Sequence, residues 1–118
     1  MLGYGYRIEH FWYGIEIFPK AIIVDSGSTD GDPYKLGLNK MTCGRDSYIE
    51  DLTPILQACY HRKTQVLIRL VGGDGSDKHV RDMLGMVEEI AAKEGHSFKV
   101  ATISAGFNRS LLKERIAS

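Results

Sequence analysis

The sequence has few of the features that mark several common protein classes. It has only two cysteines, Cys43 and Cys59, without metal-ligand spacing, so a reduced, cytoplasmic protein is a simpler expectation than a disulfide scaffold. Basic and acidic residues balance at 15 each, so no net charge attracts nucleic acid or an anionic membrane. No apolar run approaches the roughly 20 residues of a membrane span, and the first residues lack a secretory signal pattern. These absences predict no nucleic-acid partner and no membrane partner.

What the sequence does contain is an alternation of helical and strand-like patterns within a single domain, residues 1–118. Its hydrophobic content of 43% is typical of a globular domain. Apolar residues at helical spacing predict helices, and short runs rich in β-branched residues predict buried strands. The expected elements are a helix near 8–15, a strand at 21–25, a helix near 47–61, a strand at 64–70, a helix near 76–94, a strand at 97–105 and a helix at 109–118.

Local signals predict where these helices begin and end. Pro19 stops the first helix. Ser47 and Glu50 have the spacing of a capping box, so the second helix is expected to begin near Ser47. Pro54 either kinks that helix or occupies the first position of a second start. Gly95 is typical of the residue that follows the end of a helix.

Strands that alternate with helices of this length predict a parallel, right-handed α/β sheet. The expected fold class is α/β, a Rossmann-like three-layer sandwich with a mainly parallel sheet. The opening MLGYGY resembles the glycine-rich exit of a preceding strand, so the first strand of the sheet is expected to be missing from this chain. The last helix is expected to face the core with Leu111, Leu112 and Ile116.

The exits of the predicted strands form the candidate site, because such exits converge at the carboxyl edge of an open parallel sheet. Glycine lets the backbone approach a ligand, and helix N-termini present free N–H groups. The exit Ser26–Gly37 has twelve residues, where such loops usually have about 2–6. Glycine and aspartate are also ordinary turn residues. A small anionic substrate is expected here, bound by Gly3, Gly5, Ser26, Gly27, Ser28, Thr29, Tyr34, Gly72, Gly73 and Asp74.

Asp25 and Asp30 are the candidate catalytic residues. Asp25 is the last residue of a predicted strand, where a carboxylate can orient a hydroxyl, bind a metal through water or act as a general base. Its alternative role is to cap the backbone of its own loop. A Mg²⁺ site is plausible if Asp25, Asp30 or Asp32 lies close to Asp74, although the spacing demands no metal and identifies no cofactor.

The histidines and cysteines are weaker candidates. Only His79, near the start of the third helix, is placed to face the carboxyl edge, and surface positions are expected for all four histidines. Cys59 is expected in the core. Cys43 lies in a loop, and no paired histidine indicates a catalytic thiol.

Four stretches carry a family resemblance: MLGYGY, AIIVDSGSTDGDPYKLG, GGDGSDKHV and KVATISA, in this order and at these distances. Together they resemble the N-terminal region of acyclic terpene utilization (AtuA)-like proteins. VDSGSTDGDPYKLG is the most specific stretch, since it is similar to that family's Asp-x-Gly-Ser-Thr-Asp pattern followed by Gly-Pro and Tyr-x-Leu-Gly. The resemblance spans nearly the whole chain, and it implies a fragment of a longer protein.

The resemblance implies the N-terminal ligand-binding portion of a catabolic enzyme, of lyase or hydratase type, that acts on a small carboxylate or an acyl-CoA. Two other interpretations stay open. One is a non-catalytic α/β subunit or fragment that needs a partner chain or forms a homo-oligomer, because a sheet without its first strand exposes its edges. The other is a nucleotide- or phosphate-binding module of the flavodoxin-like kind.

Overall fold

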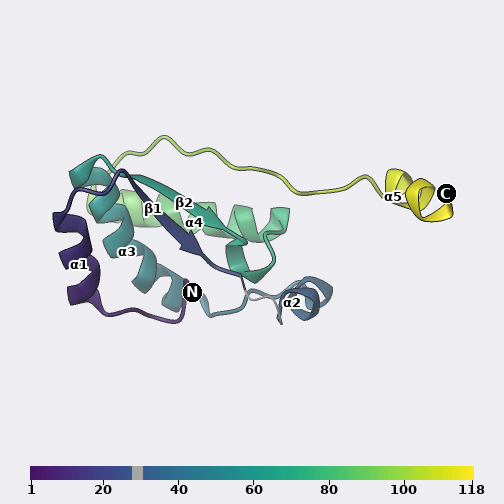
Figure 1. The fold of residues 1–118 in the computed structure, drawn as a ribbon, viewed down its shortest axis with the longest axis horizontal. Helices are drawn as coiled ribbons and strands as arrows, with labels where there is room; N and C mark the ends of the chain where they lie inside the picture. Colours follow the sequence, from purple (N-terminus) through teal and green to yellow (C-terminus); the bar gives the residue numbers. More distant parts are fainter. Residues whose placement is uncertain (28–30) are drawn as a thin grey trace.

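The centre of the protein is a pair of short parallel strands beside two long helices. A computed structural model describes residues 1–27 and 31–118, and Figure 1 shows how their elements are arranged. β1 (Ala21–Asp25) lies parallel to β2 (Gln65–Arg69). Ala21 is opposite Gln65, and Asp25 is opposite Arg69. The predicted bounds of the first strand and the parallel pairing are confirmed.

One face of this sheet packs on the hydrophobic core, which α3 (Arg45–Arg62) and α4 (Asp77–Glu94) mainly supply. Because successive side chains of a strand point to opposite faces, every second strand residue contacts the core. The buried core residues are Leu2, Tyr48, Leu52, Ile55, Leu56, Met83, Met86 and Ile90, and Ile22, Val24, Val66 and Ile68 of the strands pack against them.

The ends of the two long helices follow the predictions in part. α4 begins after Ser76 and ends at Gly95, whose φ of 68° is the left-handed conformation that glycine adopts without strain. The capping box expected from Ser47 and Glu50 is wrong, because α3 begins after Gly44, two residues before Ser47, and no side chain caps that end. Pro54 lies inside α3 without dividing it into two helices.

Two shorter helices flank the strands. α1 (Ile8–Glu16) is confirmed and buries Ile15, whereas Ile8 and Trp12 on its predicted apolar face stay exposed. The long loop predicted after β1 is wrong in its second half, which forms α2 (Asp32–Leu38). A proline in the first turn suits this helix, because that position has no intrahelical N–H bond to lose. After β2 the chain makes a short 3-10 turn, Val71–Gly73.

The predicted three-layer Rossmann-like sandwich is wrong. Within the described residues the sheet has two strands, and residues 97–105, predicted as a third strand, pair with neither of them. α5 (Arg109–Ala117) lies away from the core with its apolar side chains exposed, so the expected inward face of Leu111, Leu112 and Ile116 is also wrong. A strand forms only where a sheet edge accepts its hydrogen bonds, and β propensity in 97–105 does not supply that edge. The result is a two-stranded sheet with its core on one side.

Candidate functional site

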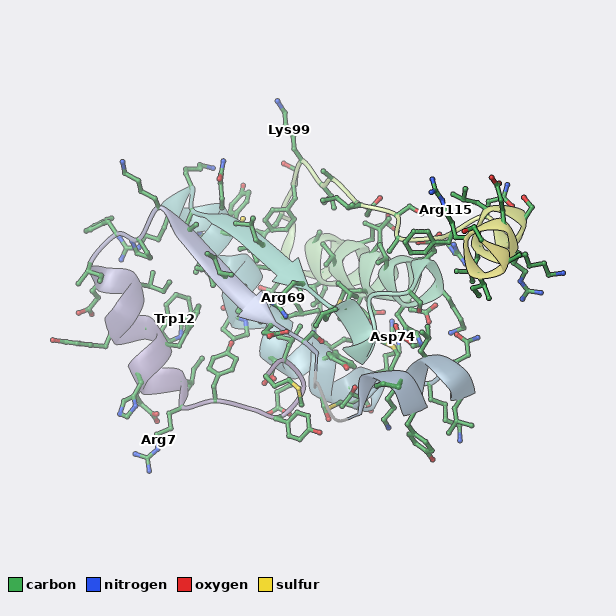
Figure 2. The ribbon with its side chains drawn as sticks, turned by 45° about the vertical axis from the view of Figure 1, so that its right-hand side comes forward. Arg7, Trp12, Arg69, Asp74, Lys99 and Arg115 are labelled. Atoms are coloured by element: carbon green, nitrogen blue, oxygen red, sulfur yellow. The ribbon has the colours of Figure 1, made fainter. Side chains whose placement is uncertain are left out.

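Segments that are distant in the sequence meet at the carboxyl ends of β1 and β2. The backbone N–H of Leu2 donates to the carbonyl of Asp25 at 3.0 Å, and the N–H of Ser26 donates to the carbonyl of Arg69 at 3.1 Å. The N–H of Thr42 donates to the Gly72 carbonyl at 2.8 Å. These bonds bring together the opening loop (residues 1–7), the exit of β1 and the exit of β2. Figure 2 shows Arg69 and Asp74 at this end of the sheet.

The end of the predicted third strand, residues 97–105, reaches the first residue of α4. Asp77 accepts hydrogen bonds from the Ser104 hydroxyl at 2.7 Å and from the Ala105 backbone N–H at 2.9 Å. These bonds hold the pKa of the exposed Asp77 carboxyl below its usual value. Residues 104 and 105 are therefore tied to the N-terminal end of α4.

The opening loop binds an anionic group that belongs to the protein itself. Asp51 Oδ2 accepts the backbone N–H of Gly3 at 2.6 Å and that of Gly5 at 3.1 Å, and the Tyr6 hydroxyl donates to the Asp51 carbonyl at 2.7 Å. Burial raises the pKa of the Tyr6 hydroxyl well above its usual value, and the nearby Asp51 carboxylate adds to this rise. The two glycine amides predicted to bind substrate are therefore occupied by Asp51, which is 5% exposed.

Asp25 caps the backbone of its own loop, the second of the two roles considered for it. Its Oδ1 accepts the N–H of Gly27 at 2.9 Å and lies 3.5 Å from Arg69 Nε. The side chains of Asp25 and Arg69 are both more than half exposed. At this exposure the ion pair contributes little to stability, about 0–1 kcal/mol. Asp25 therefore lies at the rim of the site and is bonded to its own loop.

Three of the predicted substrate-binding glycines allow close packing inside the protein. A Cβ added at Gly27 would overlap the side chain of Leu70, and one at Gly73 would overlap Thr42. A Cβ at Gly72 would lie 2.7 Å from the Cβ of His79. Gly72 and Gly73 also have positive φ angles, 73° and 109°. Internal packing accounts for glycine at these positions.

Asp74 and His79 form a buried side-chain pair at the carboxyl end of the sheet. Asp74 Oδ1 lies 2.7 Å from His79 Nδ1 and also accepts the backbone N–H of Ser76 at 2.8 Å. Burial by itself would raise the pKa of Asp74, but the hydrogen bonds from Ser76 and from His79 outweigh burial and hold this pKa below its usual value. The side chains of Asp74 and His79 are 2% and 0% exposed, so the pair lies beneath the protein surface.

Several buried polar atoms at the carboxyl end of the sheet have no hydrogen-bond partner among the residues that the structure describes. They include Asp74 Oδ2 and His79 Nε2, together with the hydroxyls of Ser26 and Ser76. The Ser26 hydroxyl lies close enough to Tyr48 to influence its pKa, and the Ser76 hydroxyl is similarly placed beside Asp74, but neither reaches hydrogen-bond geometry. Because buried polar groups are nearly always paired, these atoms are the ones at this end of the sheet that have hydrogen-bonding capacity left.

The remaining predicted residues do not add to this group. Ser28, Thr29 and Asp30 lie outside the described residues. Tyr34 is on α2, 64% exposed, with the Lys35 ammonium 5.8 Å from its ring centre. In residues 1–27 and 31–118 no cluster of three potential metal ligands is found.

One residue of the site, Asp51, was missed in the sequence, and a second, His79, was misjudged. Asp51 lies on a helix face and carried no signal of its contact with the opening loop. His79 was expected at the surface but is completely buried. The available signal was its position five residues after Asp74, which itself directly follows two glycines. Cys43 is half-buried, and burial raises the pKa of its thiol, which disfavours the reactive thiolate.

No protein family, curated protein or solved structure matches this chain. Across the part of the chain that the structure describes, no helix combines the length and the apolar character that crossing a membrane requires.

Proposed function

We propose that this chain is the N-terminal ligand-binding portion of an AtuA-like catabolic enzyme that acts on a small carboxylate or an acyl-CoA. The observation that carries the proposal is the buried Asp74–His79 pair, whose outer atoms Asp74 Oδ2 and His79 Nε2 have no partner among the described residues. The resemblance of VDSGSTDGDPYKLG to that family supplies the class of substrate.

The chemistry of the pair suits the removal of a proton from a substrate. In the neutral ring, Nδ1–H donates to Asp74, so Nε2 is the acceptor. The Asp74 carboxylate orients the imidazole and stabilises the imidazolium that forms when Nε2 takes a proton. The hydroxyls of Ser26 and Ser76 are donors of the kind that hold a substrate carboxylate or thioester oxygen. Proton abstraction beside a carbonyl is a step of lyase and hydratase reactions.

Access to His79 requires a movement, because the ring has no exposed surface. The 3-10 turn Val71–Gly73 lies directly on the ring, since Gly72 is in contact with it. The proposal therefore includes displacement of this turn when the ligand binds.

Thermal unfolding in the presence of acetate, malonate and acetyl-CoA tests the proposal. A ligand that binds only the folded state raises the melting temperature. At a ligand concentration 100 times Kd, it raises the free energy of unfolding by about 2.7 kcal/mol. We expect a rise for wild type that is lost in His79→Gln. The matched control His10→Gln changes an exposed histidine on α1 and should retain the rise. If none of the three ligands raises the melting temperature at millimolar concentration, the proposal is wrong.

A further inference from the structure

Two histidines from different helices lie side by side at the C-terminal ends of α3 and α4. His61 is in the last turn of α3, and His96 directly follows Gly95, at which α4 ends. The centres of the two imidazole rings are 5.3 Å apart, and the ring planes meet at 89°. The fold therefore brings together two imidazoles that were each expected to stand alone at the surface.

The neighbouring ring of Tyr60 shows how the two imidazoles approach each other. Tyr60 stacks on His96, with ring centres 4.0 Å apart and planes at 12°. The His61 ring centre is 5.3 Å from the Tyr60 ring centre and 5.3 Å from that of His96. A ring that is equally far from both members of a stack lies beside the stack. His61 therefore meets the edge of His96, and the edge of an imidazole is where its nitrogens bind protons and metal ions.

The ring of His96 has a nitrogen without a hydrogen-bond partner. Its Nδ1 is buried and has no partner among the residues that the structure describes. Buried polar atoms are nearly always paired. If the ring served only to stack on Tyr60, a phenylalanine would do so equally well without burying an unpaired nitrogen. The imidazole thus has a capacity for binding that its packing does not use.

The separation of the two rings is close to that of two imidazoles on one metal ion. Zn²⁺ lies about 2.0–2.1 Å from an imidazole nitrogen, so two rings bound at about 90–110° to one ion have centres about 4.5–5.2 Å apart. The observed separation of 5.3 Å is close to this range. Side-chain rotation is therefore enough to direct one nitrogen of each ring to a shared ion, and the two helices need not move.

The local charges also suit a cation. Both histidines lie at the C-terminal end of a helix, where the helix dipole is negative. The neighbouring cations are directed elsewhere. The Lys63 ammonium is 4.8 Å from the Tyr60 ring centre, and because His96 covers one face of Tyr60, this ammonium lies over the other face. The Arg62 guanidinium lies 4.8 Å from the ring centre of Phe18.

We infer that His61 and His96 bind one divalent transition-metal ion of the Zn²⁺ or Ni²⁺ class through one nitrogen of each ring. Imidazole suits these ions, whereas Mg²⁺ and Ca²⁺ prefer oxygen ligands. In residues 1–27 and 31–118 no third histidine, cysteine or carboxylate joins the pair, so water completes the coordination. The bound ion joins the ends of α3 and α4. The site is at the other end of α4 from His79, so the inference is independent of the proposed function.

Calorimetric titration of the full chain with zinc chloride at neutral pH tests the inference. We expect one ion per chain for wild type and no binding of magnesium. His61→Gln and His96→Gln should each raise Kd by at least about tenfold, because the loss of even an outer partner of a ligand costs about 10–100-fold. The matched control His10→Gln changes an exposed histidine on α1 and should keep the wild-type Kd. His61 is exposed, so His61→Gln should fold normally, as circular dichroism will show.

Two further measurements identify the ligands. Thiolates also bind zinc, so the titration is repeated with Cys43→Ala and Cys59→Ala combined, and this variant should bind zinc as wild type does. In NMR spectra, paramagnetic Ni²⁺ should broaden the ring signals of His61 and His96 and leave those of His79 unchanged. No heat of zinc binding, a wild-type Kd in both His61→Gln and His96→Gln, or loss of binding in the cysteine-free variant would overturn the inference.

Discussion

Individual polar residues decide how the carboxyl end of this sheet is organised. Asp51 is the clearest example, because its carboxylate holds the opening loop through two glycine amides. Asp25 does the same for the loop that follows β1. Much of the hydrogen-bonding capacity that the sequence suggested for a substrate is thus used within the protein. The Asp74–His79 pair keeps free capacity.

Removing the Asp51 carboxylate should destabilise the protein. In Asp51→Ala the N–H groups of Gly3 and Gly5 lose their acceptor, and leaving partly buried donors unpaired costs about 1–3 kcal/mol. Glu50→Ala is the matched control, since Glu50 is an exposed neighbour on α3, and it should change stability by less than about 0.5 kcal/mol. Urea unfolding of both variants measures the difference. Equal stabilities would show that the opening loop does not depend on Asp51.

Acid should remove a stabilising contribution of Asp74. Its pKa is lower in the folded protein than in the unfolded chain, where a carboxyl titrates near pH 3.9. The contribution is therefore complete above about pH 5 and is lost as the pH falls through the folded-state pKa. Urea midpoints measured from pH 6 down to pH 2.5 should fall more steeply for wild type than for Asp74→Asn. Parallel curves would contradict the assigned hydrogen bonds.

Whole elements were predictable where their signals are local. β1 is a run of β-branched residues, and α4 has both an apolar stripe and the stop residue Gly95, so both were found. α2 was missed because its glycines and proline resemble a loop. The predicted third strand, residues 97–105, failed for another reason. Its own composition favours a strand, but pairing depends on an edge elsewhere in the molecule, which a local pattern does not contain.

Two glycines of contrasting environment test the packing of these elements. Gly73→Ala should destabilise the protein by about 2 kcal/mol or more, because φ is 109° and the added Cβ overlaps Thr42. Gly85→Ala, on the exposed side of α4 with nothing near the added Cβ, should stabilise it by about 0.5–1 kcal/mol. Thermal unfolding of the two variants gives the sign of each change. A neutral Gly73→Ala would show that the turn after β2 adapts easily.

At the scale of the whole molecule, stability should be unevenly distributed. Residues 98–104 form no backbone–backbone hydrogen bond with other described residues, whereas β1 and β2 pair along their full length. Amide hydrogen exchange should therefore be nearly unprotected at 98–104 and slow in the two strands. Protection of 98–104 equal to that of β2 would mean that the segment is paired in solution, in conflict with the two-stranded sheet.

The site as a whole was only partly visible in the sequence. Because strand exits share one edge of a parallel sheet, Ser26, Gly72, Gly73 and Asp74 were expected together, and they lie at that end. The burial of His79 was not expected, because it depends on how closely Gly72 lets the helix approach the turn. The parallel direction of β1 and β2 was predictable from the sequence, whereas the packing of the side chains at their carboxyl ends was not.

Nitrogen-15 NMR of the His79 imidazole tests the central claim most directly. Long-range correlations identify which ring nitrogen carries a proton, and titration with acetate or acetyl-CoA shows whether Nε2 contacts a ligand. The account predicts a proton on Nδ1, the ring nitrogen that faces Asp74, and a ligand-dependent change at Nε2, while His10 is unaffected. A proton on Nε2 alone, or no change at Nε2 at saturating ligand, would contradict it.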